Sequence, residues 1–209
     1  DDNIDNDGDG DIDCADADCN TTTVSIGADT TICNGDNVTL SAVRTNCKPG
    51  ICTGTTISSF PYTESFESGL GDWTQDNGDD IDWVWDANGT PSSTTGPSNG
   101  ADGNYYLFTE ASTAQNGNPN KAAIFNGPCF DLQSAATATF DFQYHMYGGH
   151  IGTLGLEVST DNGSNWTSLW SLSGDQGNSW NAVSIDLNNY VGKLIRLRFN
   201  GETGSSYYG

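Results

Sequence analysis

The first nineteen residues carry the most distinctive chemistry in the sequence, because nine of them are Asp and none is Lys or Arg. Asp5, Asp7 and Asp9 alternate with other residues, and Gly10 and Ile12 follow them. This spacing fits a calcium loop, in which alternate carboxylates point inward, glycine permits a sharp turn and an apolar residue anchors the end. We therefore predict a Ca²⁺ site, with a solvated acidic linker as the alternative. The predicted ligands are Asp5, Asp7, Asp9, Asp11 and Asp16.

Six cysteines form the second candidate set, at positions 14, 19, 33, 47, 52 and 129. Zinc and disulfides are the two chemistries to weigh. The sequence has no C-x-x-C motif and only two His residues, and the cysteine count is even. Disulfides in an oxidising compartment are therefore favoured over zinc.

The overall composition restricts the possible partners. The chain has 28 acidic and 6 basic residues and a formal net charge of -22. Such a chain repels phosphate backbones and anionic lipid, so nucleic-acid binding and direct membrane insertion are not expected. No apolar run reaches the roughly 18 residues that cross a bilayer. The first residues do not form a signal peptide, so we expect the start to be a processed or excised end.

Strand periodicity is strong in the second half of the sequence. Apolar and polar residues alternate in 139–146, 154–158, 182–187 and 195–199, and Gly, Asn and Asp turns separate these segments. Alternation of this kind is typical of half-buried strands. No convincing helical period is present, so we predict an all-β fold, an antiparallel jelly-roll sandwich.

Several sequence blocks in this half match a known family. They are "SFESGLGDW", "YHMYGGH", "LWSLSGDQGNSW" and "LIRLRFNGETGS", in that order. From Ser65 to Gly209 the chain resembles a MAM domain. The resemblance implies a noncatalytic extracellular jelly roll that mediates adhesion, oligomerisation or ligand binding. The family continues beyond this point into an acidic strand, so we expect the last strand to be missing.

The resemblance also implies site residues. Family members hold a structural cation near the strand that carries Phe66 and Glu67. By position, the candidates here are Glu67, Asp102 and one of four acids of a nearby loop, among which we choose Asp82. The alternative to a cation site is a solvated acidic loop. These four acids are Asp76, Asp79, Asp80 and Asp82.

Aromatic residues suggest a ligand face as well as a core. A flat aromatic side chain can stack on a sugar ring. Trp85, Tyr105 and Tyr147 are the candidates for an exposed ligand face. The other Trp residues of the family-like blocks are expected in the core, and these are Trp73, Trp83, Trp170 and Trp180.

No catalytic motif is evident. His145 and His150 lie close in sequence but outside any hydrolase pattern, and His145 matches a structural His of the family, so we do not expect an enzyme. Residues 159–166 satisfy an Asp-box pattern, which predicts a turn held by Asp161. Arg196 and Arg198 are expected to face away from the core, either as an anion contact or paired with neighbouring acids.

Three parts are predicted along the chain. Residues 1–21 resemble a thrombospondin type 3 calcium repeat, 22–59 form a β linker similar to the start of adhesin Ig-like repeats, and 60–209 form the jelly roll. Within the linker the Ig-like resemblance covers about 20 residues, far fewer than a complete sandwich. The family's first cysteines are absent, which leaves Cys129 without its usual partner. We expect the pairs Cys14 with Cys19 and Cys47 with Cys52, which leaves Cys33 for Cys129.

The predicted function is recognition. We expect a calcium-stabilised adhesion or assembly module of a secreted or cell-surface bacterial protein, which binds a protein partner or itself. One alternative is a carbohydrate-binding accessory module of a secreted hydrolase or peptidase that contacts polysaccharide. Another alternative is the subunit of a surface filament.

Overall fold

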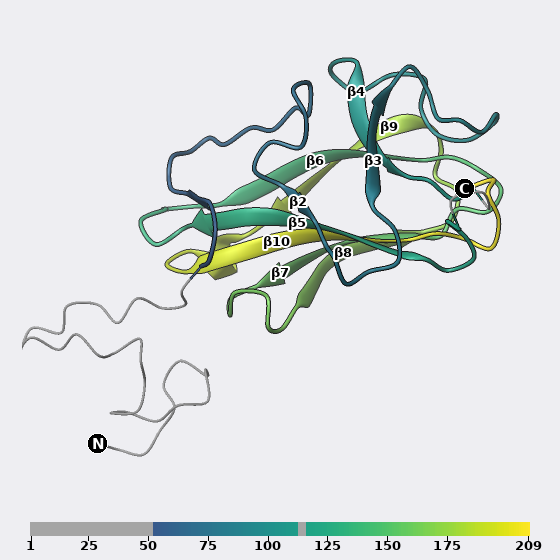
Figure 1. Cartoon of the computed structure of the whole chain (residues 1–209). Helices are drawn as coiled ribbons and strands as arrows, with labels where there is room; N and C mark the ends of the chain where they lie inside the picture. The colour runs from purple at the N-terminus through teal and green to yellow at the C-terminus, as the bar shows by residue number, and fades with distance from the viewer. Residues whose placement is uncertain (1–51, 113–115) are drawn as a thin grey trace, which may run out of the picture. The chain divides into compact units, whose positions relative to one another are not determined.

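The computed structural model describes residues 52–112 and 116–209, and its strands form a β-sandwich (Figure 1). The calcium loop predicted within 1–21 and the linker up to residue 51 lie outside the described residues. The strands are β1 (Thr56–Ile57), β2 (Thr74–Gln75), β3 (Trp83–Ala87), β4 (Tyr105–Thr109), β5 (Ala122–Asp131), β6 (Thr139–Met146), β7 (Thr153–Ser159), β8 (Thr167–Ser173), β9 (Gly177–Asp186) and β10 (Leu194–Glu202), and a 3-10 turn, η3, spans Asn188–Tyr190.

One layer of the sandwich is a continuous sheet with the order β1-β5-β10-β7-β8, and β2 also pairs with β5. All pairings in this sheet are antiparallel except that of the short β1 with β5. Strand β10 lies in the centre, with Phe199 opposite Phe125 on one side and Leu156 on the other. We call this layer the closed sheet.

The opposite layer consists of two separate antiparallel ribbons, β3-β4 and β6-β9. Ribbon β6-β9 packs on the closed sheet through aromatic contacts, such as Phe142 to Phe199 with ring centres 5.1 Å apart. Ribbon β3-β4 is tied to β5 by the indole of Trp83, whose Nε1 donates to the Ala123 carbonyl at 3.0 Å. The predicted all-β sandwich is therefore confirmed, with a mixed rather than a purely antiparallel sheet.

The core lies on the inner face of the closed sheet, where alternation in the sequence predicts it. Ile195 and Leu197 on β10 are 1 % exposed, and Leu156 and Val158 on β7 are 0 and 2 % exposed. Burial of each such side chain stabilises the fold by about 1.5–3 kcal/mol. The predicted periodicity in 154–158 and 195–199 is thus confirmed.

A disulfide joins Cys52 to Cys129, with their Cα atoms 5.8 Å apart. The predicted pairs Cys47 with Cys52 and Cys33 with Cys129 are therefore wrong. The reason is the pairing of β1 with β5, which places Thr56 opposite Cys129. Cys52 lies just before β1 in the chain, and this pairing brings it close to Cys129 on β5. Strand β1 also means that the last residues of the predicted linker belong to the sandwich. Cys14, Cys19, Cys33 and Cys47 lie outside the described residues.

The predicted Asp-box turn joins β7 to β8. The Asp161 carboxylate accepts hydrogen bonds from the Ser159 hydroxyl at 2.6 Å and from the Asn165 amide N–H at 2.9 Å. These bonds hold the pKa of Asp161 below its usual value, and the Ser159 bond is the largest cause. Trp166 at the end of the turn lies against Arg198, which fixes the hairpin on the closed sheet.

The two arginines of β10 point away from the core and have partners. Arg198 forms an ion pair with Glu157 on the adjacent strand, with Nε 2.6 Å from the carboxylate oxygen. Arg196 donates to the Asn162 side chain at 3.0 Å and to the Thr53 carbonyl. Pairing with a neighbouring acid, one of the two predicted roles, is thus seen for Arg198. Across the residues that the structure describes, no helix has the length and apolar character needed to cross a membrane.

Candidate functional site

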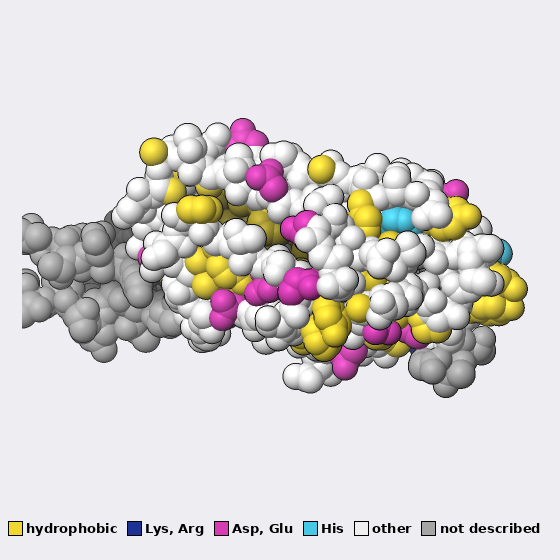
Figure 2. All heavy atoms as spheres, turned by 90° about the horizontal axis from the view of Figure 1, so that it is seen from above, with side chains coloured by type: hydrophobic (Ala, Val, Ile, Leu, Met, Phe, Trp, Pro, Cys, Tyr) yellow, Lys and Arg dark blue, Asp and Glu magenta, His cyan; other side chains and the backbone are white. Residues whose placement is uncertain are grey.

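The main surface feature is a groove between the two ribbons of the open layer. The ribbons β3-β4 and β6-β9 do not pair with each other in the described chain, and a cavity of about 1370 Å³ lies between them and extends over the closed sheet. Figure 2 shows this face hollowed, with hydrophobic side chains on its floor. The volume exceeds the roughly 300–1000 Å³ of common small-molecule pockets. A segment of polypeptide suits such a groove better than a small molecule does.

Strands β4 and β6 form the two walls. The cavity is lined by every residue of 105–110 and every residue of 139–147. Side chains of successive strand residues point to opposite faces of a sheet. Lining by consecutive residues therefore means that each strand turns its edge toward the groove. In the described residues β4 pairs only with β3 and β6 only with β9, so one edge of each wall strand has no strand partner.

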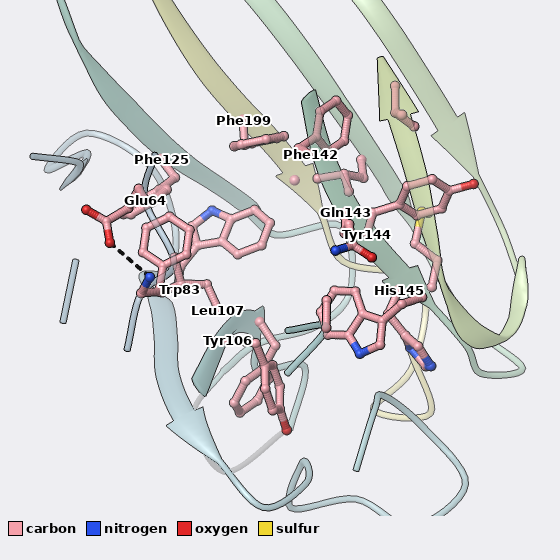
Figure 3. A pocket seen from close by; sticks show the side chains of 18 of the residues that line it. Glu64, Trp83, Tyr106, Leu107, Phe125, Phe142, Gln143, Tyr144, His145 and Phe199 are labelled. Atoms are coloured by element: carbon pink, nitrogen blue, oxygen red, sulfur yellow. Dashed lines mark hydrogen bonds between the residues drawn. The ribbon is translucent and has the colours of Figure 1, made fainter. Parts of the chain in front are cut away.

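The floor is aromatic. Phe125 of β5 and Phe199 of β10 reach the cavity from the closed sheet, and Trp73 stacks on both, with ring centres 5.3 and 5.6 Å away. Figure 3 shows Phe125 and Phe199 beside the cavity, with Tyr106 and Leu107 of β4 and Gln143, Tyr144 and His145 of β6 around it. Phe199 is only half-buried. The floor offers apolar area to a partner.

Trp180 of β9 bridges the two ribbons at one point. Its Nε1 donates to the Asn99 carbonyl at 3.0 Å, and its ring lies edge-on to Tyr106, with centres 6.1 Å apart. Trp180 was predicted to be a core residue, and the structure shows it half-buried at the groove. The bridge fixes the distance between the ribbons there without closing the groove.

The rim of the groove is acidic. Among the described residues that line it, five are carboxylates and none is Lys or Arg, and no basic side chain is visible on this face in Figure 2. One of the carboxylates, Glu64, accepts a hydrogen bond from the Phe66 amide N–H at 2.9 Å, which is drawn in Figure 3. An acidic rim disfavours an acidic ligand and favours a neutral or basic one. The five are Glu64, Asp102, Glu110, Asp141 and Glu202.

Three buried polar atoms in the groove have no hydrogen-bond partner among the described residues. They are the Tyr62 hydroxyl, the Trp73 Nε1 and the His145 Nδ1, and all three residues line the cavity. Burial raises the pKa of Tyr62 to about 12 and lowers the pKa of His145 below 6.5. An interaction with the Trp73 side chain partly offsets the effect of burial on the Tyr62 pKa, so the His145 Nδ1 is the clearest buried polar atom without a partner in the described residues.

The predicted aromatic ligand residues are only partly brought together. Trp85 and Tyr105 stack on the β3-β4 ribbon, with parallel rings and centres 4.3 Å apart, and Trp85 is 38 % exposed. Its indole donates to the Phe66 carbonyl at 2.6 Å. Tyr147 lies elsewhere, at the end of β6, where it contacts His145. The three residues therefore do not form one shared aromatic surface.

One of the predicted cation ligands of this domain, Glu67, accepts backbone hydrogen bonds. The Glu67 carboxylate accepts the backbone N–H groups of Asn104 and Tyr105 at 2.8 and 2.7 Å. Asp102 and Asp82 are exposed. In the part of the chain that the structure describes, no group of three or more acidic, Cys or His side chains is placed around a common point. The donor set seen here does not by itself fit a calcium ion, which takes six to eight oxygens.

The acidic loop before β3 covers the edge of β5. Asp79 and Asp80 accept the backbone N–H groups of Ile124 and Ala122, and Asp76 accepts the Asn126 side-chain amide at 2.9 Å. Burial raises the pKa of Asp79, whereas the bond from Asn126 is the main cause that lowers the pKa of Asp76. The Asp79 and Asp80 carboxylates thus satisfy backbone N–H groups of β5 that would otherwise be open to pairing.

Sequence reasoning missed the groove itself. Strand periodicity gives no signal for it, because alternation shows which face of a strand is buried and not which edge is paired. The alternation of Phe140, Phe142 and Tyr144 predicted a buried face on β6, and the structure confirms that face as half-buried. The alternation did not predict that one edge of β6 has no strand partner in the described residues.

Comparisons with known proteins agree on one family. Residues 65–209 match the family model "MAM domain, meprin/A5/mu". MAM domain-containing glycosylphosphatidylinositol anchor protein 1 of Rattus norvegicus is 34 % identical over 145 residues, which cover 66 % of this chain and 15 % of that protein. Neuropilin-1a of Danio rerio is 37 % identical over 103 residues, which cover 47 % of this chain and 11 % of that protein. The chain thus spans about a seventh or less of these relatives.

A solved structure with a similar arrangement is a cleaved adhesin domain of Lys-gingipain from Porphyromonas gingivalis. It has a TM-score of 0.47 and 17 % identity, and the match covers 67 % of this chain and 94 % of that one. The family assignment rests on the sequence match, which covers more than half of the chain in a continuous block. The chain therefore belongs to the MAM family.

Proposed function

We propose that this chain is a noncatalytic adhesion or assembly module of a secreted or cell-surface bacterial protein, and that the groove between β4 and β6 is its contact site for protein. The observation that carries the proposal is the aromatic floor of the groove, which lies between two strand edges that have no strand partner in the described residues. Membership of the MAM family and relatives named as glycosylphosphatidylinositol anchor proteins support an extracellular setting.

The chemistry of the groove favours contact over catalysis. Its lining supplies aromatic area and carboxylates at the rim, which together match the apolar centre and polar rim of a protein interface. Aromatic anchors in a desolvated pocket provide most of the binding energy at such interfaces. A protein segment that fills the groove would cover Phe199 and satisfy the buried polar atoms.

Calcium is part of the proposal. The carboxylates of residues 5–16 repel one another, and a bound cation would remove that repulsion. Chelation with EDTA should then increase proteolysis of the first 20 residues more than proteolysis of the sandwich. Unchanged cleavage of that segment after chelation would contradict calcium binding there.

A bead-clustering assay tests the proposed contact site. The full chain is fixed to beads, and clustering is measured with calcium and with EDTA. Gln143→Arg places a long side chain in the groove and should reduce clustering at least about tenfold. Ser171→Arg, at an exposed position on β8 outside the groove, adds the same charge and should change clustering little. Equal clustering of the two variants would refute the assignment of the groove as the contact site.

The stacked pair of Trp85 and Tyr105 supports a second candidate function, a carbohydrate-binding accessory module. An exposed indole face can stack on a sugar ring while nearby polar groups bind its hydroxyls. A glycan array with the full chain and with Trp85→Ala separates the two functions. Binding lost in Trp85→Ala but kept in Gln143→Arg would favour the carbohydrate module. A surface filament is a third candidate, in which copies of the chain contact one another.

A further inference from the structure

We propose that the disulfide between Cys52 and Cys129 is a mechanical strap, which makes tension along the chain enter the sandwich at β5 and bypass residues 53–128. The bridge joins residues that are 77 positions apart. This role rests on the proposed function, because an adhesion module is pulled whenever it holds two surfaces together. The strap sets the route of force through the chain, whereas the proposed contact site binds without any applied force.

The bridge shortens the covalent path that force follows. Cys52 precedes β1, and tension on the chain there passes through the two sulfur atoms directly to Cys129 on β5. Hydrogen bonds are weak beside a covalent bond between two sulfur atoms. The residues between the two cysteines therefore form a closed loop that the bridge protects from stretching. This loop contains β1, β2, the ribbon β3-β4 and most of β5.

Strand β1 would be a weak entry point for force without the bridge. It consists of Thr56 and Ile57 and is the edge strand of the closed sheet in the described residues. Beyond this short ladder, the Cys129 N–H donates to the Thr55 carbonyl at 3.0 Å. Tension applied to β1 would break these few hydrogen bonds one after another. The strand would then peel from the sheet edge.

Strand β5 is a stronger entry point because it is paired with the central strand β10. Their antiparallel ladder runs from Asp131 opposite Leu194 to Ala122 opposite Glu202, with one irregularity. Cys129 lies near one end of this ladder, and the chain leaves β10 at the other end. The two points at which force acts are thus separated by roughly 20 Å of paired strand.

This separation makes force act along the strands. A tethered domain rotates until the line between its two attachment points lies along the force. In Figure 1 the chain enters the sandwich at one end and the label C lies at the other end. The hydrogen bonds of an antiparallel pair are perpendicular to the strands, so sliding β10 past β5 strains all of them together. Bonds strained together resist more force than bonds broken in turn.

A set of hydrogen bonds holds the entry point beside the bridge. The Thr53 N–H donates to the Asn162 side-chain oxygen at 3.1 Å, and Arg196 Nε donates to the same oxygen at 3.0 Å. Arg196 also donates to the Thr53 carbonyl. Because Arg196 lies opposite Cys129 in the ladder, these bonds join the residue after Cys52 to β10 as well. Both the covalent and the polar contacts thus lead from the entry point to the closed sheet.

The protected loop carries much of the surface proposed for binding. It includes the β4 wall of the groove, Phe125 on the floor, and the stacked pair of Trp85 and Tyr105. With the strap in place, tension does not run along the backbone of these residues. The strap therefore lets a pulled chain keep this surface folded until the β5-β10 ladder fails.

Single-molecule force spectroscopy of the full chain, held by its two ends, tests the strap. Reduction of the unfolded, tethered chain should add about 270 Å to its length, because 77 residues of about 3.5 Å each are released. A control with Cys52 and Cys129 also replaced by Ser should have the longer length with and without reductant. In every sample the other cysteines are replaced by Ser, so that one bridge alone can form, and these are Cys14, Cys19, Cys33 and Cys47.

The unfolding force is the second readout. The bridged chain should unfold at a higher force than the reduced chain, in which β1 detaches first. Equal lengths before and after reduction would overturn the strap, because residues 53–128 would then not be a closed loop. Equal unfolding forces would overturn it as well, because entry of force at β5 would then give no reinforcement.

The proposed contact site is tested separately. Bead clustering is measured without applied force, so loss of clustering in Gln143→Arg supports the groove whether or not the strap is present. A chain that shows the added length and the higher unfolding force supports the strap, even if its beads do not cluster. Failure of the strap and failure of the contact site are therefore distinguishable.

Discussion

The two layers of the sandwich differ in how completely their strands are paired. In the closed sheet β10 pairs with both β5 and β7, and the core residues Leu156, Ile195 and Leu197 of this sheet are 0–1 % exposed. In the open layer the two ribbons remain apart, and Leu107 and Phe142 at the groove are half-buried. In the described residues the strands of the closed sheet form one continuous sheet, whereas the ribbons β3-β4 and β6-β9 do not pair with each other.

The difference shows where stability and binding reside. The closed sheet holds the largest fully buried side chains, the ion pair of Arg198 with Glu157 and the disulfide to Cys129. The open layer borders the groove, and its His145 Nδ1 is buried without a hydrogen-bond partner in the described residues. A sandwich can keep one layer open because the other layer supplies a continuous core.

The largest expected effect is in the closed core. Leu156→Ala removes a side chain that is 0 % exposed and should lower the free energy of unfolding by about 3–5 kcal/mol. Leu107→Ala at the groove should cost only about 1 kcal/mol, because this side chain is half-buried in the unfilled groove. Urea unfolding measures both. Equal costs would contradict the distinction between the two layers.

The disulfide should have the next largest effect. Cys52 and Cys129 are 77 positions apart, so their bridge restricts a long segment of the unfolded chain. Replacement of both by Ser should lower the free energy of unfolding by about 2–4 kcal/mol. Replacement of Cys33 and Cys47 by Ser is the matched control. A larger loss in the control than in the Cys52 and Cys129 variant would contradict the observed pairing.

The Asp161 turn should contribute less. Asp161→Ala removes acceptors for the Ser159 hydroxyl and the Asn165 amide and should cost about 1–2 kcal/mol. Because the pKa of Asp161 is lowered by folding, its contribution is full above the unfolded value of about 3.8 and is lost as pH falls through the folded pKa. Asp161→Asn keeps one oxygen acceptor and should cost less than Ala. A thermal melt at pH 7 that shows no change in Asp161→Ala would refute this role.

The smallest expected effect concerns His145 at the groove. Burial lowers its pKa below 6.5, so the unfolded chain takes up a proton before the folded chain does. The His145 contribution to stability is therefore full above pH 6.5 and decreases as pH falls from 6.5 to the folded pKa. His145→Gln should remove that decrease, and His150→Gln should not. NMR titration of the two imidazoles measures their pKa values, and urea unfolding at each pH measures the change in stability. A His145 pKa raised by folding would contradict the predicted loss of stability as pH falls.

The sequence predicted the strands better than their edges. The periodicity in 139–146 and 195–199 predicted which side chains face the core, because burial on one face imposes alternation. The disulfide could not be predicted, because it depends on β1 lying beside β5, and a strand of two residues has no detectable period. Trp85 and Tyr105 were predicted as a ligand face from residue type, but only the register of β3 with β4 shows that they stack on each other.

Hydrogen–deuterium exchange of the full chain is the most direct test of the groove as a contact site. The backbone amides of β4 and β6 are followed at low and high protein concentration. The proposal predicts that their exchange slows at high concentration, while β10 in the closed sheet exchanges equally slowly in both. If the beads cluster but the amides of β4 and β6 exchange at the same rate at both concentrations, the groove is not the contact site. The beads would then bind one another through a different surface.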